Sequence, residues 1–195
     1  FLTFRAPTNN DSAVSKEWRM AGYDRSTVKV YETSIQETDG VIEIHSRFSI
    51  ASPSKQPFLR LQAVWKVDLE GTIYLSLDGN FDKVFPYLPR FGIGLKLPND
   101  KTDVTYYGYG PYESYSDKHR ASWVDRFDTT VDDMFEDYVF PQENGSHYNC
   151  QYASVGNLFA KGKKPFSFQA SRYSEKELDE KAHNFELVPS DGIYV

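Results

Sequence analysis

The sequence predicts an all-β fold of the large antiparallel β-sandwich type. Apolar and polar residues alternate along residues 42–50 and 59–69, as they do in strands with one buried face. Asp39-Gly40 lies between two such runs and favours the positive φ angles of a tight hairpin turn. Helix signals are confined to two short segments. We therefore expect residues 1–195 to form one β-sandwich domain.

Residues 26–80 are expected to form a four-stranded antiparallel meander. Its first strand, Val28 to Gln36, leads through Asp39-Gly40 into a second strand. The run 59–69 is the third strand, and a fourth starts at Ile73 after a short turn. The alternation predicts one buried and one solvated face for this sheet.

Further along the chain the turn signals are denser and the strands shorter. We expect strands where apolar residues recur between these turns, in segments 93–97, 104–107, 134–140, 146–154 and 166–173. Lys161 to Pro165 is expected to be a solvated hairpin tip.

Two short helices complete the expected elements. One follows Asp11 and ends at Gly22, which suits a helix C-terminus. The other begins at Ser174, which forms a capping-box pair with Glu177. His183 is expected at its end, where a cation suits the helix dipole.

Composition excludes several classes of protein. The chain has 22 basic and 28 acidic side chains, a formal charge of −6, so a broad basic surface for nucleic acid is not expected. No apolar run approaches the roughly 18 residues needed to span a bilayer, so no membrane partner is expected. The single cysteine, Cys150, permits no internal disulfide, and we expect it to be packed in a core.

Aromatic residues make up 16% of the chain, with 14 Tyr, 14 Phe and 3 Trp. Such residues build wide β cores, and they also line carbohydrate sites, where ring faces cover the apolar patches of a sugar. Composition leaves both interpretations open.

Four segments are rich in Gly, Pro, Tyr and carboxylates, namely 5–11, 88–92, 107–117 and 138–145. Glycine beside tyrosine lets the backbone turn sharply and leaves space for a ligand against a ring face, while carboxylates accept hydrogen bonds from sugar hydroxyls. The structural alternative is that the glycines set turns and that the carboxylates pair with Arg5, Arg90 or Arg120.

No catalytic or metal-binding spacing stands out. A glycosidase needs two carboxylates about 5 to 9 Å apart, and nothing in the spacing of Glu113, Asp117 and Glu143 marks such a pair. The four histidines lack metal-ligand spacing; they are His45, His119, His147 and His183. The acidic stretch 125–137 lacks the spacing of a calcium loop, so we expect a solvated loop there.

Taken in this order, the four segments resemble the C-terminal domain of β-galactosidases of glycoside hydrolase family 2, which some species make as a separate small chain. The motifs are Arg-Ala-Pro-Thr-Asn-Asn-Asp at 5–11, Leu-Pro-Arg-Phe-Gly at 88–92, Gly-Tyr-Gly-Pro-Tyr-Glu-Ser-Tyr-Ser-Asp at 108–117 and Tyr-Val-Phe-Pro-Gln-Glu-Asn-Gly at 138–145. The similarity spans Phe4 to Leu187, with Asn9 where the family has Asp.

The resemblance implies a galactose mutarotase-like supersandwich, here truncated at both ends. It implies that the catalytic glutamates lie in a central barrel elsewhere in the enzyme, so that this chain holds no catalytic residue. It also implies no cofactor or metal in this chain, with Mg and Na ions elsewhere in the whole enzyme. The implied partners are the catalytic barrel and other domains, a β-galactoside substrate and further copies in a homo-oligomer.

Eleven residues are expected, from the resemblance and the loop chemistry, to face carbohydrate or shape its site. They are Arg5, Asn10, Asp11, Arg90, Tyr109, Glu113, Tyr115, Asp117, Glu143, Asn144 and His183. We expect Arg5 and Arg90 to order the loops around Glu113 and Glu143, because buried carboxylates need paired donors. The alternative is a stand-alone carbohydrate-binding or aldose-epimerase-like β-sandwich that uses a histidine with Glu113 or Glu143 as acid and base.

Overall fold

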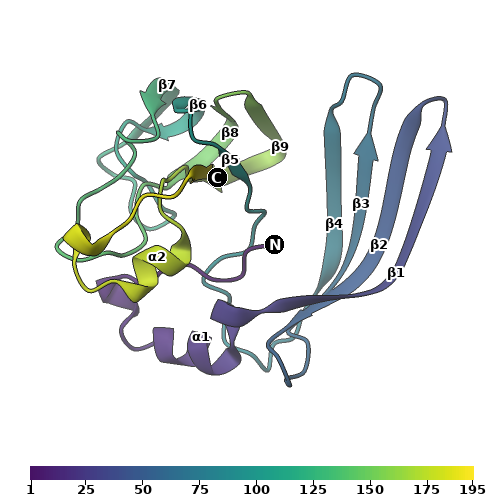
Figure 1. The fold of residues 1–195 in the computed structure, drawn as a ribbon, viewed down its shortest axis with the longest axis horizontal. Coiled ribbons are helices and arrows are strands. Elements are labelled where there is room, and N and C mark those ends of the chain that lie inside the picture. The colour runs from purple at the N-terminus through teal and green to yellow at the C-terminus, as the bar shows by residue number, and fades with distance from the viewer. The chain divides into compact units, whose positions relative to one another are not determined.

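The computed structural model describes residues 1–195 and contains ten strands and two α-helices (Figure 1). It divides into two compact units: Phe1–Ser12 with Gly92–Val195, which we call unit 1, and Ala13–Phe91, which we call unit 2. The strands pair in antiparallel sheets, so the predicted all-β class is confirmed. No helix is both long and apolar enough to cross a bilayer.

Unit 2 is built around a four-stranded antiparallel sheet. Its strands follow chain order: β1 (Thr27–Thr38), β2 (Val41–Ala51), β3 (Leu59–Val67) and β4 (Ile73–Phe81). Asp39 and Gly40, with φ of 52° and 78°, make the turn between β1 and β2. The predicted meander is confirmed.

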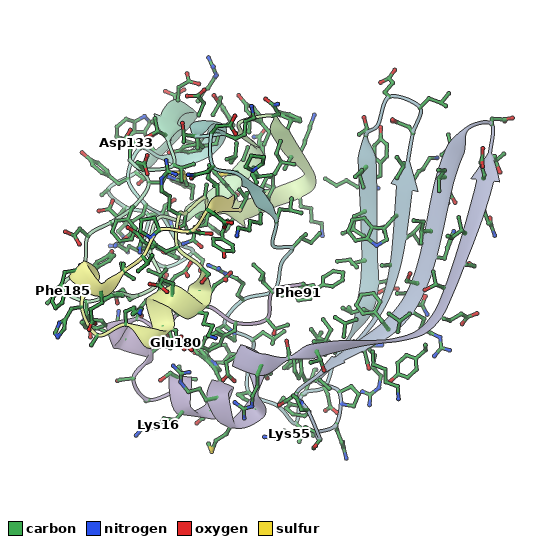
Figure 2. All side chains as sticks on the ribbon, viewed as in Figure 1. Lys16, Lys55, Phe91, Asp133, Glu180 and Phe185 are labelled. Carbon is green, nitrogen blue, oxygen red and sulfur yellow. The ribbon has the colours of Figure 1, made fainter.

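The expected buried face of this sheet is only partly buried. At one end of the apolar face, Phe48 pairs with Leu61 and both side chains are buried. At the other end of the same face, Ile35 and Ile73 are 68% and 62% exposed. Figure 2 shows side chains projecting from both faces of β1–β4.

Helix α1 (Ser15–Ala21) precedes this sheet and ends as predicted. Gly22 adopts the left-handed conformation, with φ of 83°, and its N–H bonds to the carbonyl oxygens of Trp18 and Arg19. Trp18 is fully buried, with its ring edge to face with Tyr87 at 5.8 Å. The short 3-10 helix η2 (Tyr23–Arg25) then leads into β1.

Unit 1 holds two sheets. The larger has the order β7-β6-β8-β9, from β6 (Asp103–Gly110), β7 (Trp123–Thr130), β8 (His147–Val155) and β9 (Leu158–Phe168). The smaller pairs β5 (Lys96–Pro98) with β10 (Gly192–Tyr194). The core of unit 1 is a cluster of buried residues that includes Val104, Tyr106, Cys150, Val155 and Ile193. Cys150 is therefore packed, as predicted.

Three predictions in this region are wrong. Residues 125–130, expected in a solvated loop, belong to β7, an edge strand whose exposed positions tolerate alternating charge. Residues 134–140, expected as a strand, lie outside any strand: a turn ends at Met134 and a bend lies at Val139-Phe140. The Lys161 to Pro165 segment lies inside β9, and the hairpin turns instead at Gly156-Asn157. The expected strand 166–173 is confirmed only as far as Phe168.

The C-terminal helix α2 (Glu175–Glu180) begins as predicted but ends early. Ser174 Oγ accepts a hydrogen bond from the Glu177 N–H at 3.0 Å, whereas the Glu177 carboxylate accepts from Val188 N–H at 2.8 Å rather than closing the capping box. His183 does not end α2. It precedes the 3-10 helix η3 (Asn184–Glu186); a third such turn, η1, is Asn9–Asp11.

Candidate functional site

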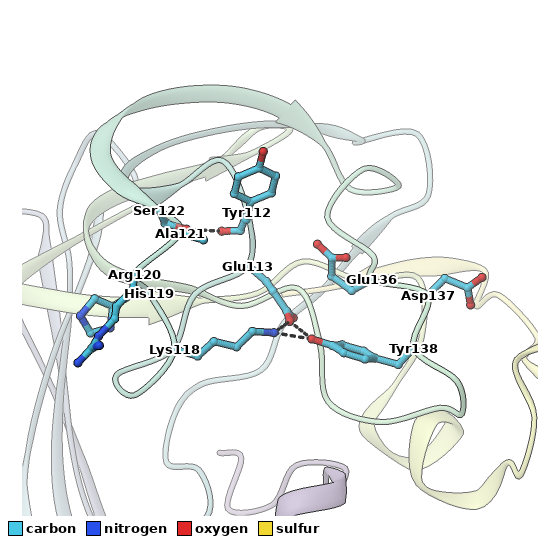
Figure 3. Close-up of a pocket in the computed structure, with 10 residues that line it drawn as sticks. All are labelled: Tyr112, Glu113, Lys118, His119, Arg120, Ala121, Ser122, Glu136, Asp137 and Tyr138. Atoms are coloured by element: carbon cyan, nitrogen blue, oxygen red, sulfur yellow. Dashed lines mark hydrogen bonds and ion pairs between the residues drawn. The ribbon is translucent and has the colours of Figure 1, made fainter.

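The candidate site lies in unit 1, where the loop after β6 meets the loop before β8. Glu113 is its central side chain and is 5% exposed. Its carboxylate accepts hydrogen bonds from Lys118 Nζ, from the Tyr138 hydroxyl and, at 2.9 Å, from the Gly145 N–H (Figure 3). Lys118 Nζ also donates to the Tyr138 hydroxyl oxygen at 2.6 Å. Glu113 therefore joins the two loops through three donors.

The electrostatics keep both side-chain donors protonated. Burial acts to lower the pKa of Lys118, but its hydrogen bonds to Glu113 and Tyr138 outweigh burial and raise it well above the usual value. Burial raises the pKa of Tyr138, and the hydrogen bond to Glu113 raises it further. Lys118 and Tyr138 therefore remain hydrogen-bond donors to Glu113.

A pocket of about 270 Å³ opens beside this set. Its lining combines aromatic, cationic, acidic and hydroxyl side chains from the two loops (Figure 3). The lining residues are Tyr112, Glu113, Lys118, His119, Arg120, Ala121, Ser122, Glu136, Asp137 and Tyr138. Burial raises the pKa of Glu136, as does the nearby charge of Glu113, while Lys118 opposes them.

Hydrogen bonds within the motif at residues 5–11 join its first residue, Arg5, to its last, Asp11. Arg5 donates to both carboxylate oxygens of Asp11, at 2.7 and 3.1 Å. The Thr8 N–H and hydroxyl also donate to Asp11, at 2.7 and 2.8 Å. Burial acts to raise the pKa of Asp11, but the hydrogen bonds from Arg5 and Thr8 prevail and lower it. This motif fixes a turn at the start of unit 1.

The Gln142-Glu143-Asn144 segment is buried and bonded to the backbone. Asn144 Oδ1 accepts from the Glu136 N–H at 3.1 Å, and its Nδ2 donates to the Gln142 carbonyl at 3.0 Å. Gln142 Oε1 accepts from the Asn9 N–H at 3.1 Å. Glu143 is 2% exposed, and its charge contributes to the raised pKa of Arg5.

The eleven expected site residues come from several segments. Arg5 bonds to Asp11 and feels the charge of Glu143, while Glu113 and Asn144 bond to the backbone of the loop before β8; all five lie in unit 1. Tyr109 stacks on Tyr148, and Tyr115 pairs through its backbone with Lys118. Asn10, Asp117 and His183 are exposed, and Arg90 belongs to unit 2.

The Glu113 carboxylate itself is bonded to Lys118, five residues along the same loop, together with Tyr138 and the Gly145 N–H. Arg5 feels the charge of Glu143 and that of Tyr115, which lies in the loop of Glu113. That Arg5 and Arg90 order the loops around Glu113 and Glu143 stays a prediction.

The glycines of the 108–117 motif do not leave space for a ligand. A Cβ on Gly108 would lie 2.3 Å from Cys150 Sγ, and one on Gly110 would lie 2.1 Å from the Tyr106 hydroxyl. These glycines allow close packing of the protein's own side chains. Gly110 also precedes Pro111 through a cis peptide bond.

Sequence reasoning missed Lys118, Tyr138, Ser114 and Glu136 as site residues. Ser114 is fully buried; its hydroxyl donates to the Tyr109 carbonyl at 3.2 Å and accepts from the Tyr148 N–H at 2.9 Å. Their positions in the sequence could have indicated them, because all four lie within or beside the motifs at 108–117 and 138–145.

The histidines nearest the site have structural partners. His147 is 2% exposed, its ring centroid lies 4.2 Å from that of Tyr106, and its Nδ1 lies 3.2 Å from the Tyr109 carbonyl oxygen. Burial lowers the pKa of His147 to about 4. His119 Nδ1 lies 2.9 Å from the Tyr115 carbonyl oxygen. No group of three or more His, Cys, Asp or Glu side chains is placed to hold a metal ion.

Comparison with known proteins shows strong similarity along the whole chain. A family model described as beta galactosidase small chain matches residues 1–195. The chain is 39% identical to a beta-galactosidase of Actinobacillus pleuropneumoniae over 191 residues, which cover 98% of the chain and 19% of the relative. It is 35% identical to one of Staphylococcus xylosus and 30% identical to one of Streptococcus thermophilus, each over 98% of the chain. The chain thus spans about a fifth of the length of these relatives.

Proposed function

The chain belongs to the beta-galactosidase small chain family, and we propose that it is the non-catalytic C-terminal domain of a β-galactosidase. The enzyme is proposed to be a retaining member of glycoside hydrolase family 2 that hydrolyses terminal β-D-galactosides. In it, this chain helps to shape the sugar pocket and the contacts between subunits. Its partners are the catalytic barrel, the other domains and further copies of the enzyme.

The proposal rests on how the buried carboxylates of this chain are hydrogen-bonded. A retaining glycosidase needs one carboxylate free to attack the sugar and a second that delivers a proton to the leaving oxygen. Glu113 is held by Lys118, Tyr138 and the Gly145 N–H, and Asp11 is held by Arg5 and Thr8. Side chains committed to such bonds order loops, which suits a domain that supports a catalytic site carried elsewhere.

The same proposal covers metal ions. Mg and Na ions, where the enzyme uses them, are proposed to bind outside this chain. The buried carboxylates of Glu113 and Asp11 are bonded to lysine, arginine, tyrosine, threonine and backbone donors, and such donors disfavour a cation.

Turnover of a chromogenic β-galactoside tests the proposal. The rate is measured with this chain alone, with the remainder of the enzyme alone and with both together. We expect measurable turnover only when both are present. Turnover by this chain alone would contradict the proposal, and mutarotation of free galactose by the chain alone would favour an aldose epimerase instead.

A further inference from the structure

The pocket beside Glu113 contains a donor and an acceptor that the protein leaves unused. Lys118 Nζ has three N–H groups and directs two of them to Glu113 and Tyr138. The Glu136 carboxylate accepts no hydrogen bond from the protein, and its ion pair with Lys118 is not formed. In Figure 3, Glu136 points from its own loop toward the loop that carries Tyr112 and Glu113.

The charges of the pocket disfavour an ionic ligand. Glu136 and Asp137 would repel an anion, while Lys118 and Arg120 would repel a cation. A neutral hydroxyl group avoids both penalties, because it can donate to a carboxylate and accept from an ammonium at once. Two adjacent hydroxyls on one ligand match a lining that presents both kinds of group.

The size of the pocket and the tyrosine at its rim narrow the class of ligand further. Its volume of about 270 Å³ lies just below the roughly 300 to 1,000 Å³ range of small-molecule pockets, which suits one ring rather than an oligosaccharide. Tyr112 lines it with a side chain that is 59% exposed, and an exposed tyrosine face can cover the C–H surface of a sugar ring.

We propose that this pocket is a subsite for a single neutral sugar ring, held through a vicinal diol between Glu136 and Lys118 and covered by Tyr112. The subsite deepens the proposed function and rests on it for the choice of galactose as the first sugar to test. The third N–H of Lys118 reaches the ring, so Glu113 keeps its bonds to Lys118 and Tyr138 while the ring is bound.

Direct binding tests the subsite. D-galactose is titrated into the chain while two-dimensional NMR follows its amide signals. We expect saturable shifts at Tyr112, Ser122 and Glu136 with a dissociation constant in the millimolar range, about 1 mM for a free energy near −4 kcal/mol. Absence of saturable shifts at these residues, or displacement of galactose by inorganic phosphate, would contradict the proposal.

Two variants and a matched control identify the residues that bind. Glu136→Gln replaces a charge-assisted hydrogen bond with a neutral one and should weaken galactose binding about tenfold. Tyr112→Ala removes the ring at an exposed position and should weaken it about fivefold. Glu70→Gln, at an exposed glutamate of the β3–β4 turn, should leave binding unchanged. Equal binding by Glu136→Gln and the unaltered chain would overturn the assignment.

The outcomes separate this inference from the proposed function. If galactose fails to bind but the chain still supports turnover with the remainder of the enzyme, only the subsite is wrong. If galactose binds as expected but the chain does not support turnover, the subsite stands and the role in a β-galactosidase fails.

Discussion

Glu113 shows how a single buried carboxylate can organise two loops. A carboxylate removed from water needs several donors to offset the cost of burial, and here it has an ammonium, a phenol and a backbone N–H. The Tyr138 hydroxyl both donates to Glu113 and accepts from Lys118. Removal of this hydroxyl should therefore weaken the bonding of both Glu113 and Lys118.

Tyr138→Phe should lower the free energy of unfolding by about 1 to 2 kcal/mol, because a hydrogen bond to a charged, buried acceptor is lost. Urea denaturation of the chain measures the change. Tyr112→Phe is the control, since the Tyr112 side chain is largely exposed, and it should change stability by less than about 0.5 kcal/mol. Equal effects of the two substitutions would show that the Tyr138 hydroxyl does not stabilise the loops.

His147 should make stability depend on pH. Burial lowers its pKa to about 4 in the folded chain, against 6.5 when unfolded. Below pH 6.5 the unfolded state binds a proton that the folded state does not, so stability falls between about pH 6.5 and pH 4 and levels off below that. The shift of 2.5 units corresponds to a loss on the order of 3 kcal/mol.

The His147 contribution is isolated with His147→Phe, which keeps a ring between Tyr106 and Phe168 but cannot titrate. Unfolding free energies of both proteins are measured at pH 7 and at pH 4.5. The difference between them should shift in favour of the variant as the pH falls. A difference that is constant over this range would contradict the assignment of the low pKa to His147.

At the scale of elements, β6 and β8 are packed so closely that one strand must carry glycine. Gly108→Ala would place a methyl group 2.3 Å from Cys150 Sγ and 2.9 Å from Cys150 Cα, so the strands must shift. We expect a loss of about 1 to 3 kcal/mol, measured by urea denaturation. Gly92→Ala is the matched control, because a Cβ there meets nothing within 4 Å, and it should be close to neutral.

The end of α1 offers a second comparison of glycines. Gly22 and Gly71 have similar φ angles, +83° and +81°, but a Cβ would lie 2.1 Å from Ser52 Oγ at Gly22 and meet nothing within 4 Å at Gly71. Alanine at either position carries the cost of a left-handed conformation, about 1 to 2 kcal/mol. Gly22→Ala should lower the free energy of unfolding by about 1 kcal/mol more than Gly71→Ala does, because its Cβ would collide with Ser52. Equal melting temperatures would show that Ser52 moves aside.

The elements that sequence could predict are those set by local signals. Alternation and Asp39-Gly40 determine β1–β4, and Gly22 determines the end of α1. Strand β7 was missed because an edge strand with alternating charges resembles a solvated loop. In the candidate site, the motifs indicated Glu113, but its donors Lys118 and Tyr138 follow from how the two loops fold together.

At the scale of the whole molecule, the structure has two compact units whereas the sequence predicted a single domain, which stays a prediction. Unit 1 is assembled from both ends of the chain, Phe1–Ser12 and Gly92–Val195, and unit 2 is continuous. The family model nevertheless matches residues 1–195 without interruption. Both units therefore belong to the part of the relatives that this chain represents.

A non-catalytic role for this chain predicts that its central carboxylate affects stability and not chemistry. Glu113→Gln, introduced into a β-galactosidase that contains this chain, replaces the charged acceptor of Lys118 and Tyr138 and should cost about 1 to 3 kcal/mol of stability. The lower melting temperature should be accompanied by a kcat, per folded enzyme, within about twofold of the unaltered enzyme, because no reacting atom is touched. Loss of an acid or base that takes part in the reaction would instead reduce kcat about a hundredfold or more. Glu70→Gln should change neither quantity, so a large fall in kcat confined to Glu113→Gln would place Glu113 in the reaction and contradict the non-catalytic role.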